Sequence, residues 1–564
     1  MATRSNNLSF ANRSVRWVTA SALAFVAAGV VAVPTSFAAG TTTAPAPVVV
    51  PATGGSAAGV PLTDGSMYNV VDQINARSMW TKGYTGKGVN VALIDTGVAP
   101  VAALSGADKV VATVDLSTEA NTPGAQFLDT FGHGTHMAGI IAGRDPGADP
   151  KLAATHPEWF MGVAPDAGLV SVKVGDNTGA VDVTQVIAGI DWVVENASAL
   201  NIRVINLSYG TDSTLPYTVD PLDAAVERAW KAGIVVVAAV GNDGRNAQHL
   251  LAPANDPYVV AVAAAERKND ALVNSSTAVK NWKVPTWANS GNGQRDPDVS
   301  APGASIVSLR DPGSRVDTEH PEGYVSTSLF KGSGSSQATA VVSGLVALLL
   351  SAKPSMTPDQ IKKTLSESAL HDVISPQDAR FSGFGLVRAD LTKLADLAQS
   401  DKRWQNWPAS NGSGNLDAVR NGSYVTVNDQ VISGNITVSG APWSTTPWVG
   451  PTWSEGTWNG SMFVDGSWRG VKWTGVKWTG VKWTGVKWTG VKWTDALWTG
   501  VKWTDESWTG MLWDGVKWTG ASWDGVKWTG ASWDGVKWTS DDWTGVKWTG
   551  VKWTGASWSG AAWR

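Results

Sequence analysis

The chain has 564 residues, a formal net charge of −4 and no cysteine. It is too long for a single compact core, so two or three units are expected, and its mixed charge does not favour a nucleic-acid partner. The lack of cysteine excludes disulfides, a thiol nucleophile and thiolate metal sites. Most of the 33 tryptophans lie in the last quarter, which indicates a separate C-terminal module.

Residues 1–38 have the pattern of a signal peptide. Three arginines precede an apolar run from Trp17 to Val33, and Ser36-Phe37-Ala38 places small residues at a cleavage site after Ala38. An uncleaved anchor is the alternative, but the run is slightly short for a membrane span. The mature protein is therefore predicted to be secreted and extracellular.

Four further segments follow. Residues 39–65 are rich in Thr, Ala, Pro and Gly and predict a flexible linker or short pro-segment. Residues 66–400 predict the main folded domain, 401–442 a polar connector with short β-prone stretches, and 443–564 a repeat array.

The main domain alternates between apolar, β-branched runs and helical patterns. The predicted strands are 89–94, 168–174, 204–207 and 234–239, and the predicted helices between them are 181–196 and 221–232. Near-continuous apolar strands separated by helices predict an α/β fold, in which a parallel sheet carries helices on both faces.

Four polar residues stand in positions that suit catalysis. Asp95 ends the first strand, at the edge where α/β proteins bind ligands. His133 lies between two glycines at a helix start, and Ser336 follows a glycine-rich turn at the first turn of an apolar helix, where the helix dipole favours developing negative charge. Asn242 follows the strand at 234–239, where its amide can reach an oxyanion.

Each of these residues has a plainer interpretation. Asp95 and Ser336 could be helix or turn caps, and Asn242 a turn former. His133 could form a metal site with His136, but the two are three residues apart and lack the glutamate of a zinc-binding helix. We expect His136 to be structural, hydrogen-bonded within its own helix.

Together, the motifs resemble the subtilisin-like serine proteases, the subtilases, over about residues 66–399. The order Asp, His, Ser is that of subtilisin. Further matching segments are Gly162-Val163-Ala164-Pro165, Asn206-Leu207-Ser208-Tyr209-Gly210 and Asp298-Val299-Ser300-Ala301-Pro302-Gly303. The resemblance implies protein or peptide substrates, a monomer and no cofactor for the chemistry, and it leaves structural calcium open.

The resemblance also implies residue roles. Ser336 attacks the scissile carbonyl, His133 moves the proton, and Asp95 orients His133. Asn242 and the Ser336 N–H stabilise the oxyanion. The expected substrate-binding residues are Ser208, Tyr209 and Gly210, with residues 179–181, as strand partners, and Ala239, Val240 and Gly241 as the wall of the primary specificity pocket. Asp243 predicts broad specificity with at most a modest preference for basic residues.

The chain departs from the family pattern in three places. Ala340 stands where proline is usual, and Ser335 replaces the usual threonine. Only residues 39–65, with linker composition, separate the predicted signal peptide from the enzyme, whereas many subtilases carry a folded propeptide there.

The C-terminal array has a tryptophan at every fifth position from Trp443 to Trp563, with Phe463 as the one exception. A helix is excluded, because five residues advance about 140° past a full turn and scatter the indoles. In a strand, Val and Trp of the unit Val-Lys-Trp-Thr-Gly share one face, which predicts a β-solenoid or stacked β-array, with disorder as the alternative. We expect the array to bind cell-wall polysaccharide or another surface.

A second class of function is a surface-binding or structural protein whose protease domain is inactive. Labelling of Ser336 with a fluorophosphonate would distinguish the two classes.

Overall fold

The computed structural model describes residues 62–267, 282–398, 400–401, 404–427, 430–440 and 442–443, together with the backbone of short strands between 453 and 563. The predicted signal peptide and most of the predicted linker lie outside the described residues.

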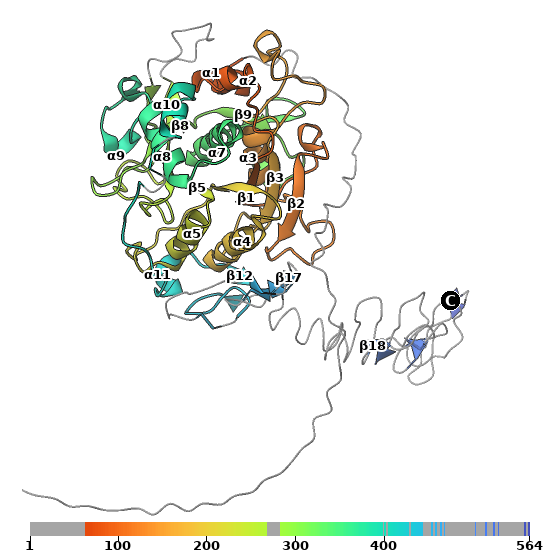
Figure 1. The fold of residues 1–564 in the computed structure, drawn as a ribbon. Helices are drawn as coiled ribbons and strands as arrows, with labels where there is room; N and C mark the ends of the chain where they lie inside the picture. Colours follow the sequence, from red (N-terminus) through yellow and green to blue (C-terminus); the bar gives the residue numbers. More distant parts are fainter. Residues whose placement is uncertain are drawn as a thin grey trace, which may run out of the picture. The chain divides into compact units, whose positions relative to one another are not determined.

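A nine-stranded, mostly parallel sheet forms the centre of the described part (Figure 1). Its parallel strands lie in the order β2-β3-β1-β4-β5-β6-β8. They are β1 (Asn90–Asp95), β2 (Val110–Asp115), β3 (Gly168–Lys173), β4 (Ile202–Leu207), β5 (Val235–Ala239), β6 (Val260–Arg267) and β8 (Val299–Pro302).

The remaining strands lie at the margins of this sheet or beside it. β7 (Trp282–Lys283) pairs antiparallel with the end of β6 and parallel with β11 (Ile374–Ser375). A separate antiparallel pair consists of β9 (Ile306–Leu309) and β10 (Leu329–Gly332).

Helices cover both faces of the sheet, as predicted. α3 (His133–Ala142) and α7 (Ser335–Ala352) pack together on one face, and α4 (Val183–Asn196) and α5 (Pro221–Lys231) pack together on the other (Figure 1). The other helices are α1 (Met67–Gln73), α2 (Arg77–Trp80), α6 (Arg315–Glu319), α8 (Pro358–Ser368), α9 (Ala379–Ser382), α10 (Leu391–Leu397) and α11 (Leu416–Arg420). Short 3-10 turns are η1 (Ala102–Leu104), η2 (Ala153–Thr155), η3 (Pro321–Gly323) and η4 (His371–Val373).

Local sequence explains where these helices begin. Asp182 caps α4 and forms a capping box with Gln185, and Asp220 caps α5 before Pro221 at its first position. The four predicted strands and two predicted helices are all present, with ends that differ from the prediction by at most two residues.

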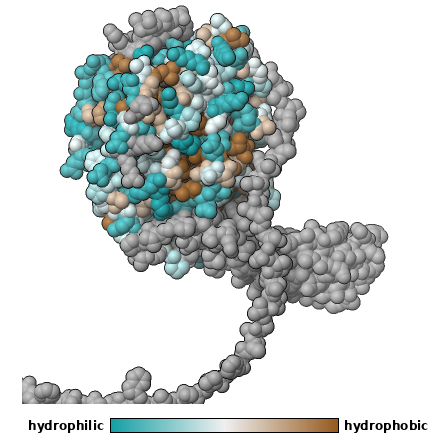
Figure 2. Space-filling model, in the orientation of Figure 1, coloured by the Kyte–Doolittle hydropathy of each residue, from teal (hydrophilic) through white to brown (hydrophobic). Residues whose placement is uncertain are grey.

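The inner faces of these elements form one main hydrophobic core, whose buried residues come from segments between α1 and Trp443. Each buried leucine, valine or isoleucine contributes about 1.5–3 kcal/mol, and the face drawn in Figure 2 is mostly hydrophilic, with smaller apolar patches. Among the described helices, α7 has the length and hydropathy of a membrane span, but 83% of it is buried inside the fold.

The segment 404–443 packs closely against the main domain. It contains α11 and the antiparallel pair β12 (Thr426–Val427) and β13 (Gln430–Val431). The buried Arg420 guanidinium pairs with Asp182 at the start of α4, with an Nε–Oδ2 distance of 2.6 Å. The indole of Trp443, the first tryptophan of the predicted array, is buried in the main core.

Beyond Trp443, the described part of the chain is the backbone of short strands. Two-residue strands pair antiparallel as β14-β15-β16-β17, β18-β19, β20-β21 and β22-β23. They are β14 (Trp453–Ser454), β15 (Thr457–Trp458), β16 (Phe463–Val464), β17 (Ser467–Trp468), β18 (Lys502–Trp503), β19 (Asp514–Gly515), β20 (Trp523–Asp524), β21 (Trp528–Thr529), β22 (Trp558–Ser559) and β23 (Ala562–Trp563). The predicted sharing of one face by Val and Trp concerns side chains outside the described part.

Candidate active site

Asp95 is the last residue of β1, at the carboxyl edge of the parallel sheet. Its Oδ1 accepts the Thr96 N–H at 2.8 Å and lies 2.7 Å from His133 Nδ1. The carboxylate is buried, whereas the His133 side chain keeps 25% of its surface exposed. The buried carboxylate therefore fixes the orientation of a ring whose other side is accessible.

His133 is placed by the start of α3 and by the glycines on either side of it. Gly132, the N-cap, has a φ of 106°, which a side chain rarely adopts. A Cβ on Gly134 would lie 2.1 Å from the Gly97 carbonyl oxygen, so glycine at 134 lets the first turn of α3 approach the turn that follows β1. These glycines therefore allow close packing, in addition to leaving the ring uncrowded.

Asp129 was not assigned a role from the sequence, yet it holds the start of α3. Its Oδ1 accepts the Gly132 N–H and the Thr96 hydroxyl, each at 2.7 Å, and its Oδ2 accepts the Thr135 N–H at 2.7 Å. The Thr96 hydroxyl in turn accepts the Gly134 N–H at 2.9 Å. Asp129 lies three residues before the N-cap Gly132, so its position in the sequence gave no capping signal.

The two histidines of α3 have opposite pKa shifts. Burial of the His133 ring opposes its protonation, but the charges of Asp95 and Asp129 outweigh that effect and raise the pKa of His133 above its ordinary value. Burial, with His133 nearby, lowers the pKa of His136 to about 4. His136 is therefore neutral near pH 7.

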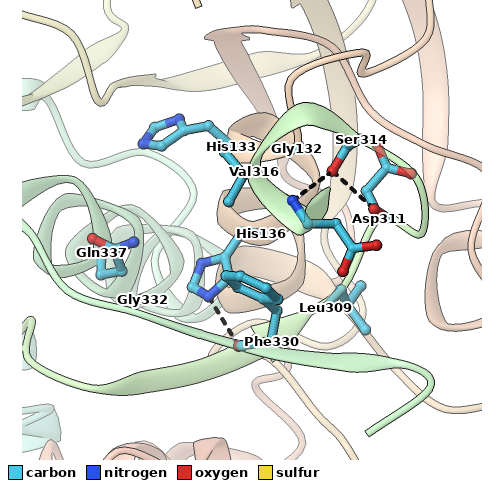
Figure 3. A pocket seen from close by; sticks show the side chains of 11 residues that line it. Gly132, His133, His136, Leu309, Asp311, Ser314, Val316, Phe330, Gly332 and Gln337 are labelled. Atoms are coloured by element: carbon cyan, nitrogen blue, oxygen red, sulfur yellow. Dashed lines mark hydrogen bonds between the residues drawn. The ribbon is translucent and has the colours of Figure 1, made fainter. Parts of the chain in front are cut away.

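The prediction that His136 is hydrogen-bonded within its own helix is wrong. Its Nε2 lies 3.2 Å from the Phe330 carbonyl oxygen on β10 (Figure 3). The His136 side chain therefore faces the β9-β10 pair, of which β9 packs against α3.

Ser336 is the second residue of α7, and its side chain is half-buried. Its Oγ donates to the Ser208 carbonyl at 3.4 Å, and the Ser208 hydroxyl donates to the Ser336 carbonyl at 3.1 Å. The predicted substrate-binding segment that begins at Ser208 is therefore joined directly to the turn that carries Ser336.

Ser336 and His133 occupy the first turns of two helices that pack together. Within the described residues, the recorded hydrogen bonds pair His133 with Asp95 and Ser336 with Ser208, and none joins Ser336 to His133. Catalytic hydrogen bonds are often long in a ligand-free enzyme.

A cavity links the two first turns. It is lined by both His133 and Gln337, the residue after Ser336 (Figure 3). On its other side lies Asp311, whose pKa is raised to about 8 by burial and by the charges of Asp129 and Asp317.

Asn242 is held by Ser335, the residue beside Ser336. Asn242 Oδ1 accepts the Ser335 N–H at 2.8 Å and the Ser335 hydroxyl at 3.0 Å. A Cβ on Gly334 would lie 3.4 Å from Asn242 Nδ2, so the amide nitrogen lies beside the turn that leads to Ser336. The serine that replaces threonine at 335 therefore keeps the hydroxyl that orients this amide.

The predicted pocket segment Ala239, Val240 and Gly241 leads from the end of β5 to Asn242. Gly241 has a φ of 114°, and a Cβ there would lie 2.7 Å from Asn289 Nδ2. Asn289 is buried and accepts the N–H of the exposed Asp243 at 2.6 Å. Asn289, which sequence reasoning missed, therefore supports the loop that carries Asn242.

The other predicted substrate-binding residues lie at the ends of elements near the site. Tyr209 and Gly210 follow β4, and residues 179–181 precede α4. Burial, with Asp182 nearby, raises the pKa of the Tyr209 hydroxyl, so it is neutral near pH 7. No group of three or more His, Asp or Glu side chains among the described residues is arranged to hold a metal ion.

Comparison with known proteins identifies the family. Residues 86–403 match the subtilase family. The chain is 34% identical to serine protease AprX of Bacillus subtilis, over 54% of this chain and 66% of that protein. It is 30% identical to the minor extracellular protease Epr of the same organism, over 56% of this chain and 40% of that protein. The solved structure of sphericase matches with 28% identity and a TM-score of 0.43, over 54% of this chain and 93% of that chain.

The matched residues contain both the sheet and the four polar residues described above, and they make up more than half of the chain. The chain belongs to the subtilase family, and it has the subtilisin-like α/β fold. It spans less than two thirds of the lengths of AprX and Epr.

Proposed function

We propose that the protein is a secreted serine endopeptidase in which Ser336, His133 and Asp95 form the catalytic triad. The observation that supports this most directly is the 2.7 Å contact between His133 Nδ1 and the buried Asp95 carboxylate. A carboxylate at Nδ1 selects the ring tautomer whose Nε2 is basic and stabilises the cation that forms there.

The proposed reaction has two stages. Ser336 Oγ bonds to the carbonyl carbon of the scissile peptide while its proton passes to His133 Nε2. The C–N bond then breaks, and His133 returns the proton to the leaving amine. In the second stage, water gives a proton to His133 and attacks the acyl ester, and Ser336 regains its proton as the carboxylic acid departs.

The negative charge on the substrate oxygen needs two donors. We assign the Asn242 side-chain amide and the Ser336 backbone N–H, since Ser335 anchors Asn242 beside the start of α7. Donors fixed before the substrate arrives cost no reorganisation during the reaction, which is why such sites accelerate acyl transfer strongly.

A covalent probe tests this proposal. A fluorophosphonate should label the wild-type enzyme on Ser336, and Ser336→Ala should lose both label and hydrolysis. Ser333→Ala is the matched control, because Ser333 is an exposed serine in the same turn and its hydroxyl accepts only the Ser305 N–H among the described contacts. Labelling that persists in Ser336→Ala, or an intact wild-type enzyme that neither reacts with the probe nor cleaves casein, would contradict the proposal.

Export and the array belong to the same proposal. The N-terminal pattern supports secretion, and one relative is named as an extracellular protease. We assign residues beyond 443 to retention of the enzyme on cell-wall polysaccharide or another surface, because regularly spaced indoles present large apolar faces that stack on sugar rings. The substrates are proteins or peptides.

A further inference from the structure

Lys173 is a completely buried lysine beside the catalytic aspartate. It is the last residue of β3, and its Cα is paired in register with that of Asp95 on β1. Its side chain has 0% of its surface exposed. A buried lysine requires partners for its charge, and the structure shows what those partners are.

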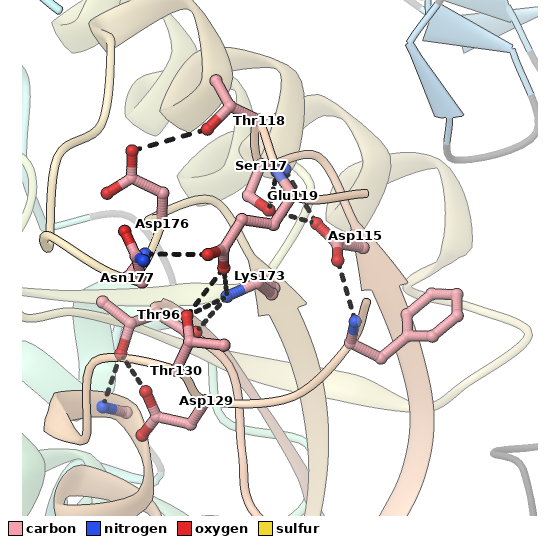
Figure 4. Close-up of polar contacts among 12 residues, drawn as sticks. Thr96, Asp115, Ser117, Thr118, Glu119, Asp129, Thr130, Lys173, Asp176 and Asn177 are labelled. Carbon is pink, nitrogen blue, oxygen red and sulfur yellow. Dashed lines mark hydrogen bonds and ion pairs between the residues drawn. The ribbon is translucent and has the colours of Figure 1, made fainter. Parts of the chain in front are cut away.

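The Lys173 ammonium has three partners, drawn in Figure 4. It donates to the Thr96 carbonyl at 2.9 Å and to the Thr130 hydroxyl at 3.4 Å, and it lies 3.0 Å from Glu119 Oε2. Thr96 follows Asp95 directly, and Thr130 follows Asp129. The ammonium therefore joins the turn that carries Asp95 to the loop that caps the helix of His133.

The contacts continue on both sides of this ammonium. Glu119 Oε2 also accepts the Thr130 hydroxyl at 2.6 Å, and its Oε1 accepts the Asn177 N–H at 3.2 Å. Asn177 opens the loop that leads to residues 179–181, one of the predicted substrate-flanking segments. The Lys173–Glu119 ion pair thus holds together the turn after Asp95, the start of α3 and this loop.

We propose that Lys173 is a positioning residue for catalysis, which holds the turn after Asp95 against the start of α3 so that the Asp95–His133 hydrogen bond stays in register. This inference rests on the proposed triad. Lys173 does not touch the reacting atoms in this account. Its effect passes through Thr96 and Thr130, and an error of about 1 Å in such a support costs up to about 100-fold in rate.

A lysine that only stabilises the fold would give a different result from one that positions the site. Lys173→Met leaves Glu119 buried without its cation, which is strongly destabilising. In Lys173→Met/Glu119→Gln both charges of the pair are removed, so neither partner is left unpaired and much of the stability returns, but the Thr96 carbonyl still lacks its donor. The double variant therefore separates stability from positioning.

The chain offers a matched control at the opposite edge of the sheet. Lys362 is also buried, lies 3.1 Å from Asp298 Oδ1 and donates to the Pro257 carbonyl at 2.6 Å. Asp298 directly precedes β8, at the amino edge of the parallel strands, whereas Asp95 ends β1 at the carboxyl edge. Lys362→Met/Asp298→Asn therefore removes a similar pair away from the site.

Two measurements on the full chain test the inference. The concentration of active sites is first determined by titration with a fluorophosphonate. Lys173→Met/Glu119→Gln should then lower kcat about 10- to 100-fold with little change in KM. The Lys362 variant should keep wild-type kcat. The second measurement is the downfield proton resonance of a hydrogen-bonded His133 Nδ1–H, which should weaken or shift only in the Lys173 variants.

Wild-type kcat and an unshifted resonance in the folded double variant would overturn the role of Lys173. Failure of the proposed function would look different. A wild-type enzyme without label or hydrolysis would remove the triad, while the resonance would still report whether Lys173 positions the His133 ring.

Discussion

In the proposed mechanism, the Asn242 amide acts mainly in the transition state. Because Ser335 fixes its oxygen, its Nδ2 is available to the substrate oxyanion. We predict that Asn242→Ala lowers kcat about 10²–10³-fold with little change in KM, since the contact strengthens as charge develops on the oxygen. Steady-state kinetics on a peptide substrate measure both constants. An effect confined to KM would mean that Asn242 only binds the substrate.

The pKa of His133 predicts the pH dependence. His133 must be neutral to accept the Ser336 proton, and its pKa lies above the ordinary value of 6.5 because of Asp95 and Asp129. We therefore expect kcat/KM to fall, as the pH is lowered, at a pH above 6.5.

Asp95→Asn provides the control for this pH dependence. It removes the main charge that raises the pKa of His133, so the fall of its residual activity should move to lower pH. Profiles of kcat/KM for both enzymes, from about pH 4 to about pH 9, make the comparison. Coincident profiles would show that Asp95 does not set the pKa of His133.

At this scale, the sequence predicted the positions in the fold of residues that stand in long motifs, and it missed single supporting residues. Asp95, His133, Asn242 and Ser336 were singled out with their neighbours and in chain order, and the structure places each at the predicted end of a strand or helix. Asp129 and Asn289 were missed, because a lone aspartate or asparagine in a loop has no distinguishing pattern until its distant partners are known.

At the scale of elements, α11 is attached to the main domain by a buried ion pair. Arg420 bonds Asp182 through two nitrogens and also donates to the Gly434 and Ile436 carbonyls. We predict that Arg420→Met lowers the free energy of unfolding by about 3–5 kcal/mol, because the buried Asp182 charge is left unpaired. Denaturant unfolding followed by circular dichroism measures this change.

An exposed arginine is the control for this prediction. Arg380 pairs with Asp378 on the surface, where water screens the charges, so Arg380→Met should leave the unfolding midpoint nearly unchanged. Similar effects from both substitutions would mean that α11 is only loosely attached.

Four strands of the sheet were predicted, whereas β2, β6 and β8 were missed, although β6 and β8 are largely buried. The predicted strands β1, β3, β4 and β5 are rich in Val, Ile, Leu and Ala and almost fully buried, as expected for a parallel sheet covered on both faces. β2 has partly exposed residues and β8 ends in Pro302, so neither matches that pattern. Segment 401–442 has a polar composition, which gives no sign that Arg420 is buried. Its partner, Asp182, lies 238 residues earlier in the sequence.

At the scale of the whole molecule, the structure shows that a deletion of the repeat array should begin after Trp443 and not at Trp443. Trp443 begins the five-residue pattern, but its indole is buried in the main core, and its backbone N–H donates to the Asn435 carbonyl at 2.9 Å. Burying a tryptophan contributes several kcal/mol, about 3–5 in typical substitutions to alanine. A deletion that includes Trp443 would therefore destabilise the enzyme for reasons unrelated to the array.

A deletion of residues 444–564 avoids this effect and tests the surface role. We predict that the shortened enzyme hydrolyses a small peptide with unchanged kcat and KM, because the triad residues, Asn242 and Trp443 all remain. It should lose retention on purified cell-wall polymer, measured as the fraction of activity that sediments with the polymer. An inactive Ser336→Ala full-length protein, followed by immunoblot, controls for retention through the active site itself. Equal sedimentation of the full-length and shortened proteins would exclude the adhesive role, and a fall in peptide hydrolysis would show that the array also supports the catalytic domain.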